Sequence, residues 1–465
     1  MSDQPTGMPV PQFHYSPIVP YVDSESTNKL YCAYTAGPLW AGVQPFEYTG
    51  WRDEAKSWHE NCYLHANLNP AAHIKISGPD CTALFKHALV NSFEKFPIGG
   101  GKHAIFCDEN GYILDDGVLL RLGENDYEGF CLSPYMEFYA AQGNYNVKIE
   151  NGNDFVFQLA GPNSLAVVQA ATGEDLTDIK FFHHRKSVIA DKPVTILRVG
   201  MAGSLAYEVH GDYSDGVAIY QAILEAGKPY GLRRLGTPAY DMTHWEGGFP
   251  QLFLDWLSTC HQYAPIQDFP MFKMLQSGRM GDGSGEWGYG NMRFEGSAAE
   301  HPELLFRTPY DNAWGKTVRF DHDFVGRDAL EKLAQNPPRT MVTLEWNEED
   351  VLDVIRTQFS DDPCLDISEP DDFSFGHPIY HSDFVYANGE QVGVTSGRMM
   401  SPYYHKMISL CPIKSALAVE GTPVEILWGM PGERQMRIRA TVARYPYNNE
   451  FRNDKVDASA LGKGK

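Results

Sequence analysis

The stretch that decides the fold begins with RVGMAGSLAYEVHGD (residues 198–212) and ends with LGTPAYDMTHWEGG (235–248). Between these ends, residues 214–227 place apolar side chains at helical spacing and finish on a glycine, which predicts a helix. Each flanking segment has a turn of small residues and presents a polar group, Glu208 in the first and Tyr240 in the second. Glycines in the first turn allow tight bends and the close approach of a flat ligand. On the residues alone, two interpretations stay open: a ligand site, or an ordinary strand–helix–loop unit with a surface glutamate and a core tyrosine.

The same stretch resembles the core of the glycine-cleavage T-protein (aminomethyltransferase) family. That family has a strand ending in Gly-Tyr-Thr-Gly-Glu-Asp-Gly-x-Glu, then a helix and a Gly-x-x-Ala-Arg-Asp-x-x-x-x-Glu-x-Gly segment. Tyr240 stands where the aminomethyl enzymes have arginine. A tyrosine there is similar to the tetrahydrofolate-dependent aromatic O-demethylases of the vanillate and syringate type. The positions shared with the two family patterns are Gly200, Gly203, Glu208, Gly236, Ala239, Asp241, Glu246 and Gly248.

Further motifs in the family's order extend the resemblance over residues 50 to 455, among them a Gln-x-x-Gly-Pro element that starts at Gln158 and is expected to be structural. The resemblance implies an α+β fold: a T-protein-like three-domain cloverleaf with a folate-binding α/β core and a C-terminal antiparallel β-barrel. The expected divisions are an extended N-terminal arm (1–50), a core of two subdomains (51–335) with an insertion at 257–305, the barrel (338–455) and a flexible tail (456–465).

Composition limits the partners. The chain has 38 basic and 60 acidic residues, a formal charge of −22, which argues against nucleic acid because few cations are available to displace phosphate counterions. The first residues contain no apolar signal segment and no run reaches membrane-spanning length, so we expect a cytoplasmic protein without a membrane partner. The eight cysteines are scattered and are expected to be reduced, and no Cys-x-x-Cys pair suggests a metal.

Two adjacent acids interrupt an apolar strand after the hairpin signal Asn110-Gly111. Strand alternation places one of Asp115 and Asp116 toward the interior, where a carboxylate is unfavourable unless it is paired or functional. In the T-protein family this element places an aspartate near N5 of the folate. A structural salt bridge to Arg121 or to a nearby base is the alternative.

The resemblance implies an enzyme that moves a methyl group from a methoxylated aromatic acid to N5 of tetrahydrofolate, giving 5-methyltetrahydrofolate and a phenol. Tyr240 suits the departing oxygen because the unperturbed pKa of a tyrosine, about 10, is close to that of the phenol released. Glu208 is expected to accept hydrogen bonds from the pterin, and Asp115 and Asp116 to lie beside N5. No metal is required.

The remaining site predictions concern the folate and the methyl donor. Tyr207 and Glu246 are the further candidates for folate binding. The candidates for donor contacts are Asn67, Asn69, Arg121 and Trp256, with Arg121, Arg398 and Lys406 as possible partners of a donor carboxylate. The glycine-rich residues 281–290 predict a mobile loop or a lid over the site.

Two other functions stay open. One is another transferase of this fold that uses an N-, S- or aminomethyl donor, although Tyr240 in place of arginine argues against the aminomethyl case. The other is a folate-binding protein that keeps Glu208 and has no turnover.

Overall fold

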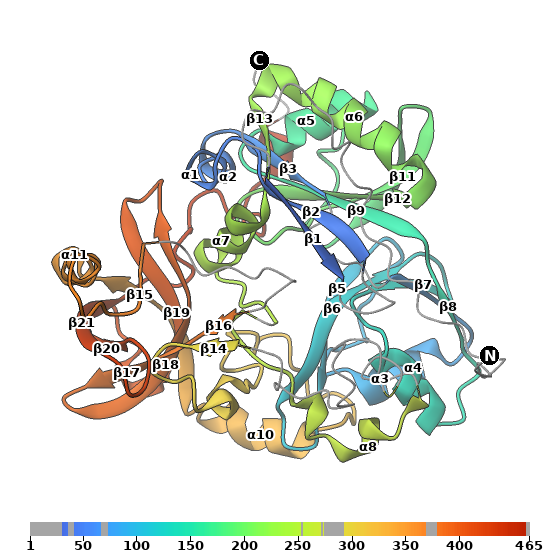
Figure 1. The fold of residues 1–465 in the computed structure, drawn as a ribbon. Helices are drawn as coiled ribbons and strands as arrows, with labels where there is room; N and C mark the ends of the chain where they lie inside the picture. Colours follow the sequence, from blue (N-terminus) through green and yellow to red (C-terminus); the bar gives the residue numbers. More distant parts are fainter. Residues whose placement is uncertain are drawn as a thin grey trace, which may run out of the picture.

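The computed structural model describes residues 30–35, 41–66, 73–252, 254–270, 273, 293–368 and 379–461, with the side chains of 30–46 and of residue 261 left out of the description. Three lobes surround a centre to which helix α7 (Thr237–Gly247) contributes, as Figure 1 shows. Two lobes are sheets covered by helices and the third is a barrel, so the predicted α+β architecture is confirmed.

The first lobe is a six-stranded sheet. Its strands, in spatial order, are β10 (His184–Ile189), β11 (Lys192–Leu197), β12 (Ala206–Asp212), β9 (Asp154–Ala160), β3 (Cys62–His65) and β13 (Leu232–Arg234). One face of this sheet is covered by α5 (Ser164–Thr172) and α6 (Gly216–Gly227), the second of which is the helix that the sequence predicts. Side chains alternate across a strand, so each strand sends every other residue to this covered, apolar face.

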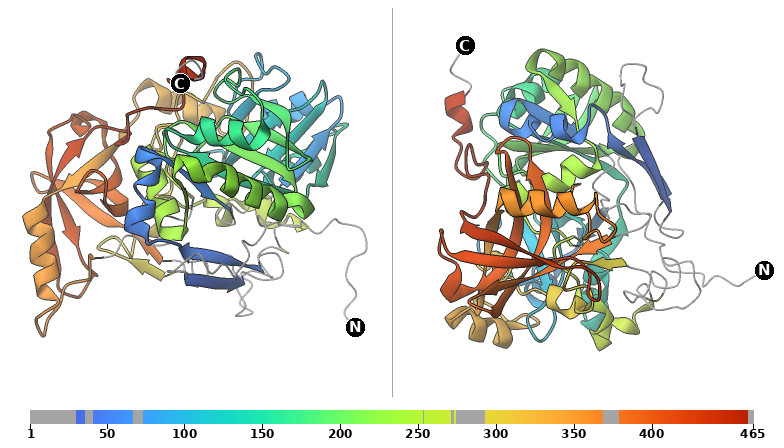
Figure 2. Two further views of the ribbon diagram at one scale, coloured as in Figure 1. Left: turned by 90° about the horizontal axis from the view of Figure 1, so that it is seen from above. Right: turned by 60° about the vertical axis from the view of Figure 1, so that its left-hand side comes forward.

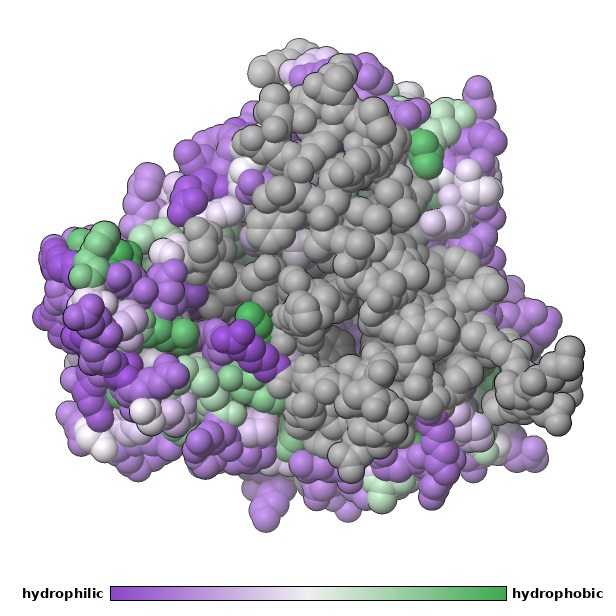
Figure 3. Space-filling model, in the orientation of Figure 1, coloured by the Kyte–Doolittle hydropathy of each residue, from purple (hydrophilic) through white to green (hydrophobic). Residues whose placement is uncertain are grey.

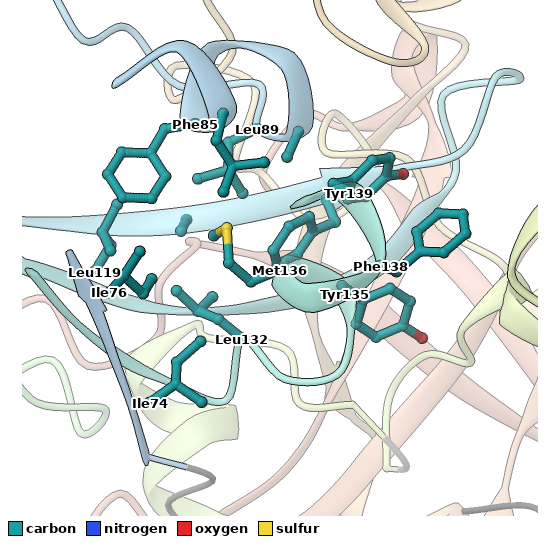
Figure 4. Close-up of a cluster of buried hydrophobic side chains, with 14 of the residues drawn as sticks. Ile74, Ile76, Phe85, Leu89, Leu119, Leu132, Tyr135, Met136, Phe138 and Tyr139 are labelled. Carbon is teal, nitrogen blue, oxygen red and sulfur yellow. The ribbon is translucent and has the colours of Figure 1, made fainter. Parts of the chain in front are cut away.

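The second lobe is a five-stranded sheet in the order β5 (Gly101–Cys107), β6 (Ile113–Arg121), β7 (Asp126–Phe130), β4 (His73–Ser77) and β8 (Lys148–Asn151). The hairpin between β5 and β6 confirms the Asn110-Gly111 signal, and Gly111 has a positive φ of 83°. Helices α3 (Cys81–Ala88) and α4 (Tyr135–Gln142) contribute Phe85, Met136 and Tyr139 to the core drawn in Figure 4.

The third lobe is a closed barrel of β15 (Arg339–Trp346), β19 (Lys406–Lys414), β18 (Glu390–Ser401), β17 (Asp383–Ala387), β20 (Pro423–Trp428) and β21 (Met436–Ala443). All of its strand pairs are antiparallel, as the sequence predicts. The acidic insertion after β15 begins with α11 (Glu348–Thr357). Figure 2 shows the barrel set to one side of the two sheets.

Short elements join the lobes. Every residue of α7 is buried, and α7 lies between the first sheet and the barrel strands β18 and β19. The Trp-rich segment 51–60 forms two single-turn helices, α1 (Trp51–Glu54) and α2 (Ser57–Glu60). The remaining helices and strands are α8 (Ala264–Gln267), β14 (Arg293–Glu295), α10 (Arg327–Gln335), β16 (Ile379–His381) and α12 (Ala458–Leu461). The predicted insertion at 257–305 is tied to the third lobe because β14 pairs with β16.

The two ends of the described chain differ from the sequence prediction. Within the predicted extended arm, β1 (Leu30–Thr35) pairs with β2 (Ala41–Glu47) as an antiparallel hairpin. In the described part of the predicted tail, residues 456–461, the chain packs against the first lobe. Arg198 donates hydrogen bonds to the carbonyls of Asn453 (2.8 Å) and Val456 (2.7 Å), and Ala458 is buried in the core of the first lobe.

The described surface is mostly hydrophilic in the view of Figure 3, with small hydrophobic patches between purple regions. This agrees with the excess of acidic over basic residues. Among the helices that the structure describes, none is both long enough and apolar enough to cross a membrane.

Candidate functional site

The uncovered face of the six-stranded sheet carries a row of polar side chains. Alternation that sends Tyr207 and Leu159 to the helices sends Glu208 and Gln158 to the opposite face. The strand register aligns this row: His65 on β3 lies opposite Gln158 on β9, and Gln158 lies opposite Glu208 on β12. All three members are at least 97% buried. A buried polar row on an otherwise apolar sheet marks this face as the candidate site.

Glu208 is held from both sides. The amide nitrogen of Gln158 donates to Oε1 at 3.0 Å, and His210 Nε2 lies 2.9 Å from Oε2, where it donates because a carboxylate oxygen accepts. Gln158 is held in turn, since its carbonyl oxygen accepts a hydrogen bond of 2.7 Å from the hydroxyl of Tyr63. Each oxygen of an ionised carboxylate has lone pairs for more than one donor. Glu208 is therefore fixed in orientation and still able to accept from a ligand.

Tyr240 comes to the same region from α7. Its ring centre lies 4.7 Å from that of His65 and 4.7 Å from that of His244, both in edge-to-face geometry. Within the part of the chain that the structure describes, its hydroxyl makes no hydrogen bond. Burial raises the pKa of Tyr240 well above the usual range, and the nearby charges of Asp241 and Glu208 act in the same direction. The hydroxyl thus keeps its proton and can donate a hydrogen bond, but its raised pKa departs from the match with the released phenol that the sequence argument used.

The two histidines beside Tyr240 are uncharged near neutral pH. Burial lowers the pKa of His65 to about 3 and that of His244 to about 4, because imidazolium is poorly solvated away from water. His244 Nδ1 lies 3.2 Å from the backbone carbonyl of Tyr240, whereas neither ring nitrogen of His65 has a hydrogen-bond partner within the described ranges of the chain. The surroundings of Tyr240 are therefore aromatic and neutral.

Asp115 and Asp116 point to opposite faces of the second sheet, as alternation requires. Asp115 pairs with Phe106, which faces α4, whereas Asp116 pairs with Ile105 on the other face. Asp116 Oδ2 lies 2.7 Å from His103 Nε2, so the predicted salt bridge to a nearby base exists for this residue. Because the two carboxylates diverge, they cannot both lie beside N5 in this arrangement, and a role for one of them stays a prediction.

Tyr207 and Glu246, the further candidates for folate binding, lie elsewhere than the sequence suggested. Tyr207 faces the helices and is fully buried in the core beneath the sheet, where burial raises its pKa to about 12. Both oxygens of Glu246 are engaged by protein groups: Trp58 Nε1 at 2.8 Å, His59 Nε2 at 2.6 Å and Ser401 Oγ at 2.6 Å. Tyr207 thus packs the core, and Glu246 links α7 to α2 and to the barrel.

The candidate donor contacts are also placed differently. Arg121 donates to the backbone carbonyls of Phe96 (2.5 Å), Gly123 (3.1 Å) and Glu124 (3.1 Å), which anchors a loop rather than a ligand. Trp256 is fully buried and donates to the carbonyl of Pro250 at 3.3 Å. Asn67, Asn69 and the glycine-rich residues 281–290 lie outside the described residues.

The two remaining cations proposed for a donor carboxylate belong to the barrel. Arg398 donates to the carbonyl of Ile367 at 2.9 Å and its guanidinium lies 5.0 Å from the ring centre of Trp428. Lys406 forms an ion pair of 3.0 Å with Glu345. Neither interaction brings a positive charge to Tyr240.

The glycines of the first turn serve packing. Gly203 has φ 79°, which disfavours other residues, and a Cβ on Gly247 would lie 2.1 Å from the carbonyl oxygen of Met201. The turn and the end of α7 therefore touch through their backbones. This contact fixes α7 against the strand that carries Glu208.

One group among the described residues has the composition of a cation site. His73, Glu128 and Asp154 place ligand atoms within 4.8 Å of one another where the two sheets meet. Burial raises the pKa of both carboxyl groups. The group lies outside the polar row, and the expectation that the reaction needs no metal stays a prediction.

Sequence reasoning missed three residues of the site. Gln158 was predicted to be structural, and His65 and His210 were not singled out. Each interrupts an apolar strand with a polar side chain, and each falls on the same alternation as Glu208. That alternation was the signal available in the sequence.

Comparisons with known proteins agree with this fold. Residues 32–263 match the model of the GCVT N-terminal domain. Sesamin methylene transferase of Sinomonas sp. strain No.22 is 40% identical over 433 residues, which cover 90% of this chain and 94% of that protein. Syringate O-demethylase of Sphingobium sp. strain SYK-6 is 33% identical over 451 residues, which cover 91% of this chain and 94% of that protein.

A solved structure gives the same fold. The aminomethyltransferase T of the glycine cleavage system from Bartonella henselae superposes with a TM-score of 0.64 at 18% identity, covering 91% of this chain and 95% of that one. Fold and site thus define a transferase built on the aminomethyltransferase architecture. The chain belongs to the GCVT family and is an enzyme of its tetrahydrofolate-dependent transferases.

Proposed function

We propose that this enzyme moves a one-carbon unit from the oxygen of an aromatic ether to tetrahydrofolate. The observation that carries the proposal is the pairing of two buried groups. Among the described residues, Tyr240 offers a protonated hydroxyl without a hydrogen bond, beside His65 at the end of the polar row, and Glu208 in that row offers a carboxylate of fixed orientation. The first suits an ether oxygen, and the second suits the N–H donors of a pterin.

The residues present fit tetrahydrofolate. A pterin edge presents several N–H donors, and a buried carboxylate held in orientation by Gln158 and His210 is a strong acceptor for them. Glu208 lies on the sheet face that α5 and α6 leave uncovered. Tetrahydrofolate, when bound, supplies the nucleophilic nitrogen. The chain supplies orientation and the exclusion of water, which are effective in a site this buried.

Tyr240 acts at the oxygen that leaves. As the C–O bond of the ether breaks and the new N–C bond forms, its hydroxyl donates a hydrogen bond or a proton to that oxygen. The proton that the nitrogen loses balances the proton that the oxygen gains. For a methoxy group the products are a phenol and 5-methyltetrahydrofolate.

A second candidate is the transfer of a methylene group. The relative at 40% identity carries the name sesamin methylene transferase, whereas the O-demethylase is 33% identical. A methylene bridge between two aromatic oxygens would give a catechol and 5,10-methylenetetrahydrofolate, with both nitrogen protons passing to the oxygens. We also propose that the aromatic ether need not carry a carboxylate. The three cations considered as partners for a donor carboxylate have other partners in the protein: Arg121, Arg398 and Lys406.

Anaerobic incubation with tetrahydrofolate and two groups of donors tests both forms. One group contains methoxylated aromatic acids, including syringate, and the other contains methylenedioxy arenes, including sesamin. Mass spectrometry should show a phenol or catechol in equal amount to the matching folate product, and the folate product decides between methyl and methylene transfer. Tight folate binding without product from any donor would contradict the proposal.

A further inference from the structure

His65 is a buried polar residue whose position the fold does not explain. It is 1% exposed, and among the described residues neither of its buried ring nitrogens has a partner at hydrogen-bond geometry. An unpaired buried polar group costs about 1–3 kcal/mol, and native proteins keep few of them. A phenylalanine would fill the same space without that cost. Within the described residues the imidazole therefore has both ring nitrogens available for a further group.

The neighbours of His65 show where that group would bind. Across the strand pair lies Gln158, whose amide is already used by Tyr63 and Glu208. Over His65 lies the ring of Tyr240, with 4.7 Å between the ring centres. His65 is also the last residue of β3, at the edge of the polar row that ends on Glu208. His65 thus lies beside Tyr240, at the end of the polar row that forms the candidate site.

His244 provides the contrast within the same cluster. It lies at the same 4.7 Å from Tyr240 and is equally buried, but its Nδ1 lies 3.2 Å from the backbone carbonyl of Tyr240. That contact explains why a histidine is present at this position of α7. No such contact explains His65.

We propose, on the basis of the function proposed above, that His65 is a specificity-determining contact for the aromatic donor. Its imidazole forms a hydrogen bond with a second polar group of the donor, on the ring position next to the oxygen that Tyr240 contacts. A neutral imidazole has one donor and one acceptor, so it can bind an ether oxygen or a hydroxyl group. Because the two rings are in contact, the two donor groups that they bind lie on neighbouring ring positions.

Matched donors and three substitutions test this proposal. The two donors are aryl methyl ethers with the same methoxy group. One carries an oxygen substituent on the neighbouring ring position, and the other carries hydrogen there. His65→Phe keeps the ring and removes the hydrogen bond, whereas His65→Gln and His65→Asn keep a polar side chain. His184→Phe is the control, because it removes a half-buried imidazole from β10, at the other edge of the same sheet.

The readout is the ratio of kcat/KM between the two donors. We expect the wild-type protein to favour the oxygen-bearing donor by at least about tenfold, since a site built for a hydrogen bond rejects a donor that lacks the group. His65→Phe should bring the ratio of kcat/KM close to one. It should do so by lowering activity only on the donor that carries the second oxygen substituent. His65→Gln or His65→Asn should restore part of the ratio, and His184→Phe should leave it unchanged.

Several results would overturn the proposal. Equal loss on both donors in His65→Phe would assign His65 to folding or to the chemical step, and an unchanged ratio would remove it from the donor site. If His65→Phe does not fold, a ratio unaltered in both His65→Gln and His65→Asn gives the same negative answer. Absence of turnover by the wild-type protein with every donor would instead contradict the function itself.

Discussion

Two buried polar clusters lie on either side of α7, and they differ in how completely they are paired. Around Glu246, both carboxylate oxygens are bonded to Trp58, His59 and Ser401. Around Tyr240, the hydroxyl makes no hydrogen bond among the described residues, and both nitrogens of His65 are unpaired. The two clusters are similarly buried. Burial alone therefore does not separate them, but pairing does.

The difference in pairing distinguishes a cluster that stabilises the fold from one that is suited to bind a ligand. In a fully paired buried cluster, hydrogen bonds within the protein offset the free energy lost on desolvation. Such a cluster therefore fixes the lobes in place. A partly unpaired cluster is unfavourable in the protein alone and becomes favourable only when a ligand supplies the missing partners. The Glu246 cluster thus joins α2, α7 and the barrel, and the Tyr240 cluster is the one that we propose binds the substrates.

The largest expected effect comes from Tyr240→Phe. Removing the hydroxyl should lower kcat by about 10²–10⁴, the usual contribution of a positioned acid, while folate affinity stays within a few-fold of wild type. Steady-state kinetics and equilibrium binding measure the two quantities. Tyr207→Phe is the matched control, since it removes a buried hydroxyl from the opposite face of the sheet and should leave both quantities unchanged. Full activity in Tyr240→Phe would remove its role at the departing oxygen.

Glu246→Ala should act on stability rather than on folate binding. The substitution leaves Trp58, His59 and Ser401 without their shared acceptor and should lower the free energy of unfolding by about 3 kcal/mol. Thermal unfolding followed by circular dichroism checks this. A variant that unfolds at the wild-type temperature but no longer binds tetrahydrofolate would return Glu246 to the folate site.

Glu208→Gln should weaken tetrahydrofolate binding by about 10–100-fold, because a hydrogen bond to a charged group contributes about 1.5–3 kcal/mol. Anaerobic titration calorimetry measures the dissociation constant. Glu225→Gln, on the exposed surface of α6, is the control for loss of a carboxylate and should bind as the wild type does. Equal affinity in Glu208→Gln would mean that the pterin lies elsewhere.

The smallest expected effect is a dependence of stability on pH. The pKa of His65 falls from an ordinary 6.5 to about 3 on folding, mainly through burial, so between these values the unfolded chain binds the extra proton. Stability from this residue is therefore complete above pH 6.5 and is lost as the pH falls. His65→Gln should reduce the loss of unfolding free energy between pH 7.5 and 5.0 by roughly 2 kcal/mol. Identical pH profiles in urea titrations would show that His65 does not stay neutral.

Motifs predicted the architecture well because they report local geometry. The Asn110-Gly111 hairpin, the helix after Glu208 and the barrel strands each follow from turn residues and from apolar spacing that any segment carries by itself. These features needed no knowledge of distant partners. Tyr240 was predicted at a turn of small residues, but it lies on helix α7, and Glu208 lies within strand β12.

The site was predicted less completely because its remaining features depend on contacts between distant segments. Glu246 and Ser401 are 155 residues apart, so no local pattern could show that the glutamate is already engaged. The side chain of Arg121 donates hydrogen bonds to backbone carbonyls that only the folded chain brings together. Tyr207 is the exception, since its alternation with Glu208 already placed it on the other face.

The anchoring of residues 448–456 has a consequence for biosynthesis. The turn before β12 is held by late residues: Asn448 donates to the carbonyl of Ala202 at 2.9 Å, and the backbone nitrogen of Asn453 donates to that of Gly203 at 2.9 Å. The ribosome makes these residues about 250 positions after the turn, so the strand bearing Glu208 remains incompletely supported while the barrel is still being translated. The candidate site is therefore synthesised before the barrel but is completed only after residues near the end of the chain have been made.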